Sequence, residues 1–356
     1  MARRTSAGIP RHAWRPVVAA VLMTLLACDR PASGPGHATS QPVAEAKASQ
    51  AYVAYPTHAL RLVIPFAAGG GADRWGRFVA AKLGEQLGQP FAIENVPGRG
   101  GNDGTEVTSK AAGDGYTLLL GSTGPLVVHA WTYDHLPFDA EKDFVPVGLI
   151  ESSPLLLVVH ADVKATSLQE LLALAKADPG QLSFATNGNG SPEQVAGELF
   201  ERLAQVSLRD VPYDGAGPAR KDLSKGHVTM MFDVCKAAMG AVQERRQRPL
   251  AVADGDRAKR LPGVPTLTEL GFPEIRMRIW TGLFAPRGTP SVVVETLNAA
   301  LRRVLEDGDV RRTIEDVGGE PMPMSPEEVA GFLAAERAHW QQLVRDSGVS
   351  RVNGPL

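Results

Sequence analysis

Short apolar runs separated by amphipathic stretches recur along the chain from Arg61 onward. Such runs suit buried β-strands, because a strand covered on both faces reads as nearly continuous apolar sequence. We expect strands at Leu62–Phe66, Phe91–Asn95, Tyr116–Gly121, Val145–Ile150, Leu155–His160, Leu182–Thr186, Val228–Asp233, Leu250–Ala253 and Thr281–Ala285. Helical stretches lie between many of them. This alternation predicts an α/β protein with largely parallel sheets.

Several helix starts are marked by capping signals. A serine followed three residues later by Glu or Gln satisfies free amides of the first helical turn. Three segments carry this pattern, namely Ser167–Glu170, Ser191–Gln194 and Ser325–Glu328, and the last two also place a proline at the first helical position. Thr289-Pro290 is expected to open a further helix, with Val293, Leu297 and Leu301 on one face.

The N-terminal segment indicates an exported protein. Four arginines, at positions 3, 4, 11 and 15, precede the apolar run Val17–Ala27. This run is too short to cross a hydrocarbon core of about 30 Å as a permanent helix, and it is typical of a secretory signal. Because Leu25–Cys28 resembles a bacterial lipobox, we predict a lipoprotein signal peptide over 1–27 and lipidation of Cys28. A plain secretory signal and an uncleaved short anchor are the alternatives.

Composition limits the partners. Removal of 1–27 takes four arginines and no acidic residue, so the mature chain keeps 33 basic and 39 acidic residues, a net charge of −6. This argues against a nucleic-acid partner. Residues 28–54 are rich in Ala, Ser, Pro and Gly and are interpreted as a flexible tether. With Cys28 lipidated, Cys235 is left alone and no internal disulfide forms.

Three glycine-bearing loops lie between an expected strand and an expected helix: Pro65–Asp73, Thr186–Ser191 and Tyr213–Pro218. Free amides and a partial positive charge at a helix start form a cradle for a carboxylate or a phosphate. The alternative is that each loop is a tight turn that binds nothing. The first loop matches neither the Walker sequence nor the dinucleotide-binding fingerprint.

Individual residues near these loops are open to more than one interpretation. Asp73 is most simply an N-cap, with direct ligand contact as the alternative. Arg99 either faces a ligand carboxylate or is solvated in its glycine turn. Cys235 is interpreted as a small buried hydrophobe. Trp280 with Phe284 is expected to pack in the core or hinge, with a cleft wall as the alternative, and the spacing of His129 and His135 does not suit a metal pair.

Several motifs, in this order, resemble the Bug family (TctC-like proteins), the extracytoplasmic solute receptors of tripartite tricarboxylate transporters. They are Tyr55–Phe66, Gly69–Asp73, Pro97–Asn102, Asp114–Gly121, Leu136–Asp139, Ala196–Phe200, Val211–Tyr213, Met231–Asp233, Leu261–Thr266 and Trp280–Pro286. The resemblance extends over about 55–350. Ala67-Ala68, Arg99, Asp214 and the stretch Val234–Lys236 depart from the family pattern and leave the identity of the ligand open.

The resemblance implies a periplasmic-binding-protein-like α/β fold with two lobes, a hinge of two crossings and a ligand cleft between them. Lobe one would comprise 55–157 plus 282–356, and lobe two 158–281. The implied ligand-binding residues are Phe66, Ala67, Gly69, Gly70, Asp73, Gly121, Ser122, Thr123, Thr186, Asn187, Gly190, Ser191, Tyr213 and Asp233. No catalytic residue, cofactor or metal is implied.

The implied function is capture of a small organic acid in the periplasm. The protein would be a monomer, tethered to a membrane through its lipid, that delivers the acid to the membrane permease subunits of a tripartite tricarboxylate transporter. Two alternatives remain at this point: a ligand receptor for a membrane signalling partner, and an exported enzyme on the same scaffold. No set of acid–base or nucleophilic residues in the sequence supports the enzyme.

Overall fold

The computed structural model describes residues 55–353. The predicted signal peptide, the predicted tether and Cys28 lie outside the described residues. Within 55–353, no helix combines the length and the apolar character needed to cross a membrane.

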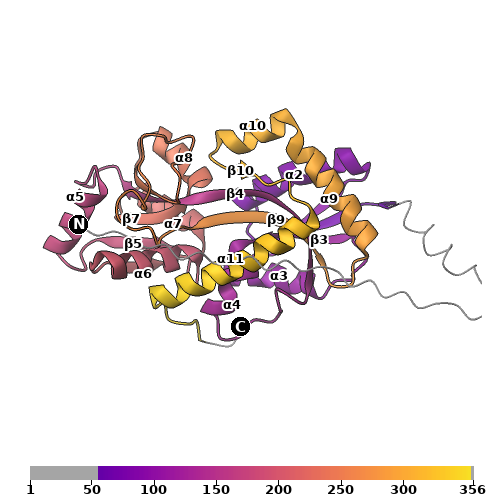
Figure 1. The fold of residues 1–356 in the computed structure, drawn as a ribbon, viewed down its shortest axis with the longest axis horizontal. Coiled ribbons are helices and arrows are strands. Elements are labelled where there is room, and N and C mark those ends of the chain that lie inside the picture. Colours follow the sequence, from indigo (N-terminus) through magenta and orange to yellow (C-terminus); the bar gives the residue numbers. More distant parts are fainter. Residues whose placement is uncertain (1–54, 354–356) are drawn as a thin grey trace, which may run out of the picture. The chain divides into compact units, whose positions relative to one another are not determined.

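The described strands form one mixed sheet in the order β2-β1-β3-β9-β4-β7-β5-β6, with β8 and β10 also paired to β4 (Figure 1). Their bounds are β1 Leu60–Ile64, β2 Phe91–Asn95, β3 Thr117–Ser122, β4 Phe144–His160, β5 Ser183–Thr186, β6 Arg209–Pro212, β7 Met230–Val234, β8 Gln247–Ala253, β9 Arg278–Pro286 and β10 Glu320–Pro321. The mixed α/β fold with a central sheet agrees with the predicted fold class.

Strand β4 joins two groups of strands. Its first part, from Phe144 to Pro154, pairs with β9, whereas Leu155 and the residues after it pair with β7 and β8. All these pairings are antiparallel. Parallel pairing is confined to the outer strands, where β1 pairs with β2 and β3, and β5 pairs with β6 and β7. The prediction of largely parallel sheets is therefore wrong for the centre, and the two strands expected within 145–160 are one continuous strand.

The helices are α2 Gly71–Leu87, α3 Asn102–Ser109, α4 His129–Thr132, α5 Leu168–Ala177, α6 Pro192–Ala204, α7 Ala216–Leu223, α8 Cys235–Gln243, α9 Ser291–Glu306, α10 Gly308–Asp316 and α11 Pro326–Ser347, with shorter helical turns η1 Arg99–Gly101 and η2 Gly124–Val128. The three serine caps are confirmed, since each hydroxyl accepts a hydrogen bond from the amide three residues on. The helix expected to open at Thr289-Pro290 is α9, whose N-cap is Pro290.

Helices cover both faces of the sheet. Helix α11, drawn in yellow in Figure 1, crosses the front of the sheet and packs against α6 and β4. Beneath it Trp280 is fully buried, and its indole N–H donates to Glu336 Oε2 at 3.1 Å. Phe284 is buried beside it, with ring centroids 6.0 Å apart. This confirms the core interpretation of both aromatic residues.

Candidate functional site

The loop between β1 and α2 is organised by one buried carboxylate. Asp73 accepts hydrogen bonds from the Gly69 amide at 2.8 Å, from Arg77 Nε at 2.9 Å and from Asn95 Nδ2 at 2.9 Å. The hydrogen bond from Arg77, followed by that from Gly69, lowers the pKa of Asp73 from 3.8 to about 2. Asp73 is therefore ionised at neutral pH, and its acceptor capacity is used within the protein.

The prediction that Asp73 caps α2 is wrong in position. The N-cap is Gly70, and Asp73 sits in the first turn and reaches back to Gly69. The Gly69 amide is therefore engaged, and the Gly70 amide donates to Ala67 O at 3.3 Å. Gly70 supplies no capping side chain, the ionised Asp73 in the first turn offsets part of the positive character of this helix start, and Ala67 is exposed.

The end of β3 is buried and tightly packed. A Cβ at Gly121 would meet Leu126 at 2.4 Å and Phe284 at 2.6 Å, so only glycine fits there. Thr123 Oγ1 accepts from the Trp280 amide at 2.9 Å, which fastens the end of β3 to β9. Ser122, which pairs with Thr281 on β9, is buried at the same strand end.

The loop before α6 satisfies most of its own polar groups. Gln194 Oε1 accepts from the Gly190 amide at 2.7 Å, and the Ser191 hydroxyl accepts from the Gln194 amide at 3.2 Å. Thr186 is buried at the end of β5, and Asn187 keeps a buried Oδ1 that has no hydrogen-bond partner among the described residues. The Gly190 amide is therefore engaged by a side chain in the first turn of α6.

The structure brings predicted segments from distant parts of the chain together. Thr132 donates to Gly190 O at 2.9 Å, and the Tyr133 hydroxyl donates to Asn189 O at 3.2 Å. A Cβ at Gly124, just after β3, would lie 3.9 Å from Pro192 Cδ at the start of α6. The segment after β3 and the loop before α6 are therefore neighbours.

The same region is linked to the first loop through two glycines. A Cβ at Gly101 would lie 3.2 Å from the Phe66 ring and 3.0 Å from Pro125. A Cβ at Gly100 would lie 3.1 Å from the His129 ring. Phe66, the glycine turn and the segment after β3 thus form one continuous packed surface.

A charged cluster at the end of β7 includes two residues that sequence reasoning missed. Asp233 is buried and binds Arg220 in a two-pronged ion pair, with Nε–Oδ2 and Nη2–Oδ1 both at 2.8 Å. Glu193, in the first turn of α6, is only 4% exposed. Burial, followed by the negative charge of Asp233, raises the pKa of Glu193 from 4.5 to about 7. An acid in a first helical turn and an arginine within a helix look like ordinary surface residues in a sequence.

Tyr213 and Arg99 are both committed to partners within the protein. The Tyr213 hydroxyl donates to Asp222 Oδ2 at 3.0 Å, which holds the predicted third loop against α7. Arg99 pairs with Asp103 and, at 2.8 Å, with Glu106. The guanidinium of Arg99 therefore stabilises its own glycine turn.

The remaining reactive side chains are buried. Cys235 is fully buried, and burial raises the pKa of its thiol to about 11, which confirms the interpretation as a small hydrophobe. His129 Nδ1 lies 2.7 Å from Asn102 Oδ1, and burial lowers the pKa of His129 to about 3. Within 55–353, no group of three or more His, Cys, Asp or Glu side chains is placed to hold a metal ion.

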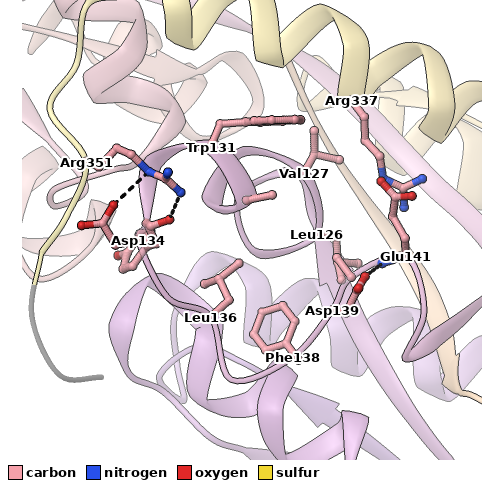
Figure 2. A pocket seen from close by; sticks show the side chains of 13 residues that line it. Leu126, Val127, Trp131, Asp134, Leu136, Phe138, Asp139, Glu141, Arg337 and Arg351 are labelled. Carbon is pink, nitrogen blue, oxygen red and sulfur yellow. Dashed lines mark hydrogen bonds and ion pairs between the residues drawn. The ribbon is translucent and has the colours of Figure 1, made fainter.

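Two cavities lie beside these segments. The one in Figure 2, of about 340 Å³, has apolar walls that include Leu126, Trp131 and Phe138, and arginines paired with acids at its edge. The other, of about 590 Å³, lies between α7 and α8 and has a basic lining that includes Lys221 and Arg246. Neither is lined by any predicted ligand-binding residue.

Comparisons with known proteins agree with the fold. The family model described as "Tripartite tricarboxylate transporter family receptor" matches 76–349. The chain is 36% identical to the protein BugT of Bordetella pertussis over 295 residues. The aligned region covers 83% of this chain and 90% of BugT. A structure of Rpa4515 of R. palustris with adipate superposes with a TM-score of 0.80 at 32% identity, covering 84% of this chain and 100% of the other.

A second solved structure is similar to the same extent. MatC from Rhodopseudomonas palustris with bound malate gives a TM-score of 0.76 at 34% identity, covering 82% of this chain and 100% of the other. The family is one of periplasmic solute receptors and not of enzymes. Because its model matches most of the described residues, the chain belongs to the tripartite tricarboxylate transporter receptor family, which includes the Bug proteins.

Proposed function

We propose that this protein captures a small carboxylate-bearing metabolite in the periplasm and delivers it to the membrane permease subunits of a tripartite tricarboxylate transporter. Membership of a receptor family whose solved members include adipate-bound and malate-bound proteins is the observation that carries the proposal. A lipidated Cys28 and the tether over 28–54 would hold the receptor, as a monomer, at the membrane surface where the permease lies.

The proposed ligand site lies between two lobes, 55–157 plus 282–356 and 158–281. The change of partner within β4 supports this division, because β9 flanks the strand before Leu155 and β7 and β8 flank it afterwards. The strands β1, β2 and β3 run in the direction of β4, whereas β5, β6 and β7 run against it, so the carboxyl ends of the two groups point toward each other. Ligands of open α/β sheets bind outside such strand ends.

The predicted ligand residues contribute in different ways. The amides of Gly69 and Gly190 are engaged within the protein and shape their loops. The ligand contacts are assigned to the first turn of α2 after Gly70, to Ser122 at the end of β3 and to Asn187 after β5. Asp73 and Asp233 hold the two sides of the site in position and do not themselves accept from the ligand.

The test is calorimetry on the mature chain, with Cys28 replaced by Ser and bound solutes removed by unfolding and refolding. The titrants are adipate, malate and other dicarboxylates and tricarboxylates, with the matched diamides as neutral controls. Binding of one acid, without binding of its diamide, supports capture of a carboxylate. Failure of every acid to bind the correctly refolded protein refutes it.

Delivery is tested separately. Deletion of the gene should abolish growth on, or uptake of, the acid identified by calorimetry, and a plasmid copy should restore it. Uptake that continues unchanged in the deletion strain would rule out a transport role while leaving ligand capture intact.

A further inference from the structure

A cluster of three side chains links helices α2 and α8 to strand β4. Lys236, in the first turn of α8, forms an ion pair with Glu151 on β4. Its Nζ lies 5.9 Å from the ring centroid of Trp75, which is in the first half of α2. The ammonium group therefore lies between two helices that belong to different proposed lobes.

The cluster contains polar atoms that the protein does not satisfy. Glu151 is 1% exposed, and its Oε1 accepts from Thr281 Oγ1 at 2.8 Å as well as from Lys236. Its Oε2 and the indole Nε1 of Trp75 are buried and have no hydrogen-bond partner among the described residues. An unpaired buried polar group costs free energy. An acceptor, a donor and an ammonium group thus stand near one another.

Lys236 is the partly exposed member of the ion pair. The side chain of Lys236 is 24% exposed, whereas that of Glu151 is 1% exposed. The amides at the start of α8 are engaged within the protein, since Val234 N donates to Asp233 Oδ1 at 2.8 Å and Lys236 N to Ser153 Oγ at 3.2 Å, so the charge offered here is that of the Lys236 side chain. The cluster also adjoins the proposed site, because Thr281, which donates to Glu151, pairs with Ser122 at the end of β3.

We propose that Lys236 binds a carboxylate of the ligand, with Glu151 as its internal counter-ion and Trp75 as the facing wall. The proposal rests on the function proposed above and assigns a residue to its ligand site. A bound carboxylate accepts from the ammonium group beside the Trp75 ring.

A purely structural ion pair would behave differently. Its role would be to fasten α8 to β4, and removal of either partner would then weaken the protein in the same way. A recognition role separates the two residues, because Lys236 attracts the ligand and Glu151 neutralises Lys236. The two substitutions should then change ligand affinity in opposite directions.

The experiment compares Lys236→Gln and Glu151→Gln with wild type by calorimetry, using adipate and malate as probes. Lys236→Gln should weaken binding about tenfold or more, since a hydrogen bond to a charged group is lost. Glu151→Gln should tighten adipate binding about threefold or more, because the ammonium loses its counter-charge. Lys82 and Glu85 form an exposed lysine–glutamate pair on α2 and provide matched controls, whose Gln variants should keep wild-type affinity.

Equal weakening by both substitutions, or unchanged affinity in Lys236→Gln, would overturn the assignment. Circular dichroism and thermal unfolding establish that each variant is folded, and Lys236→Arg, which keeps a cation, should retain most of the affinity. If wild type binds one of the acids and Lys236→Gln binds it equally, only this inference fails. If wild type binds no acid at all, the proposed function fails with it.

Trp75 provides an independent measurement. A carboxylate that displaces or joins the ammonium beside its ring should change the tryptophan emission on binding. Trp75→Phe should remove most of that change while the protein still binds ligand. Persistence of the full emission change in Trp75→Phe would show that the ligand does not reach this cluster.

Discussion

Replacement of Glu193 by Gln should make the protein more stable at alkaline pH. The carboxyl group lies in the first turn of α6, is 4% exposed and faces Asp233, with Arg220 and Asn187 nearby. Its pKa is raised from 4.5 to about 7, because ionisation in this buried position is unfavourable. At about 1.36 kcal/mol for each pKa unit, the ionised group costs about 3 kcal/mol of folding stability.

The sign follows from proton binding. Between about pH 4.5 and 7 the folded protein holds the proton of Glu193 more tightly than the unfolded chain does. The stability of wild type should therefore fall as the pH rises through this range and level off above it. The amide introduced by Glu193→Gln is neutral at every pH and lacks this loss, so the difference between variant and wild type should grow by about 2–3 kcal/mol from pH 5 to pH 8.

Urea unfolding at several pH values measures that difference directly. Other groups with altered pKa, such as Asp210 and Glu336, are common to both proteins and cancel. Glu306→Gln changes an exposed glutamate and serves as the control, with a difference that stays constant with pH. If the difference between Glu193→Gln and wild type does not vary with pH, the burial argument for Glu193 is refuted.

Three further substitutions test the polar framework by urea unfolding. Asp73→Asn should cost about 2 kcal/mol of folding stability at pH 7, because the pKa of Asp73 is lowered to about 2. This stability difference should shrink as the pH falls below about 4, and a difference that stays constant with pH would contradict the assignment. Arg220→Met leaves Asp233 buried without its partner and should cost about 3–5 kcal/mol of folding stability. The double variant Arg220→Met/Asp233→Asn should recover most of this loss, and equal losses in the single and double variants would argue against the ion pair. Ser325→Ala removes a full capping box and should cost about 1 kcal/mol, whereas Ser350→Ala, at an exposed position, should cost nothing measurable.

Local sequence signals predicted the elements that depend on neighbouring residues. The apolar run Phe91–Asn95 has the bounds of β2, and Ser325 with Glu328 forms the expected reciprocal cap. These features need only residues within a few positions of one another. The prediction failed for two strands that carry no apolar run, namely β6, with the sequence RDVP, and the two-residue β10. These strands form only because a neighbouring strand is present to pair with them.

The site was predicted in outline and changed in detail. The sequence correctly placed glycine loops between strands and helices, but it could not show which amides are already used. Gly69 donates to a carboxylate four residues on, and Gly190 donates to a glutamine four residues on. Both acceptors are visible in the sequence, and only the observed loop conformations decide that they turn back onto those amides.

The sequence by itself determined the family, the positions of most strands and the capped helix starts, because motif order and short-range hydrogen bonding are properties of the linear chain. Only the tertiary structure decided which charges meet. Lys236 and Glu151 are separated by 85 positions, and Arg220 and Asp233 lie on different elements. The burial that raises the pKa of Glu193 likewise exists only once α6 is docked at the end of β7, since desolvation depends on what surrounds a group in space and not on its neighbours in sequence.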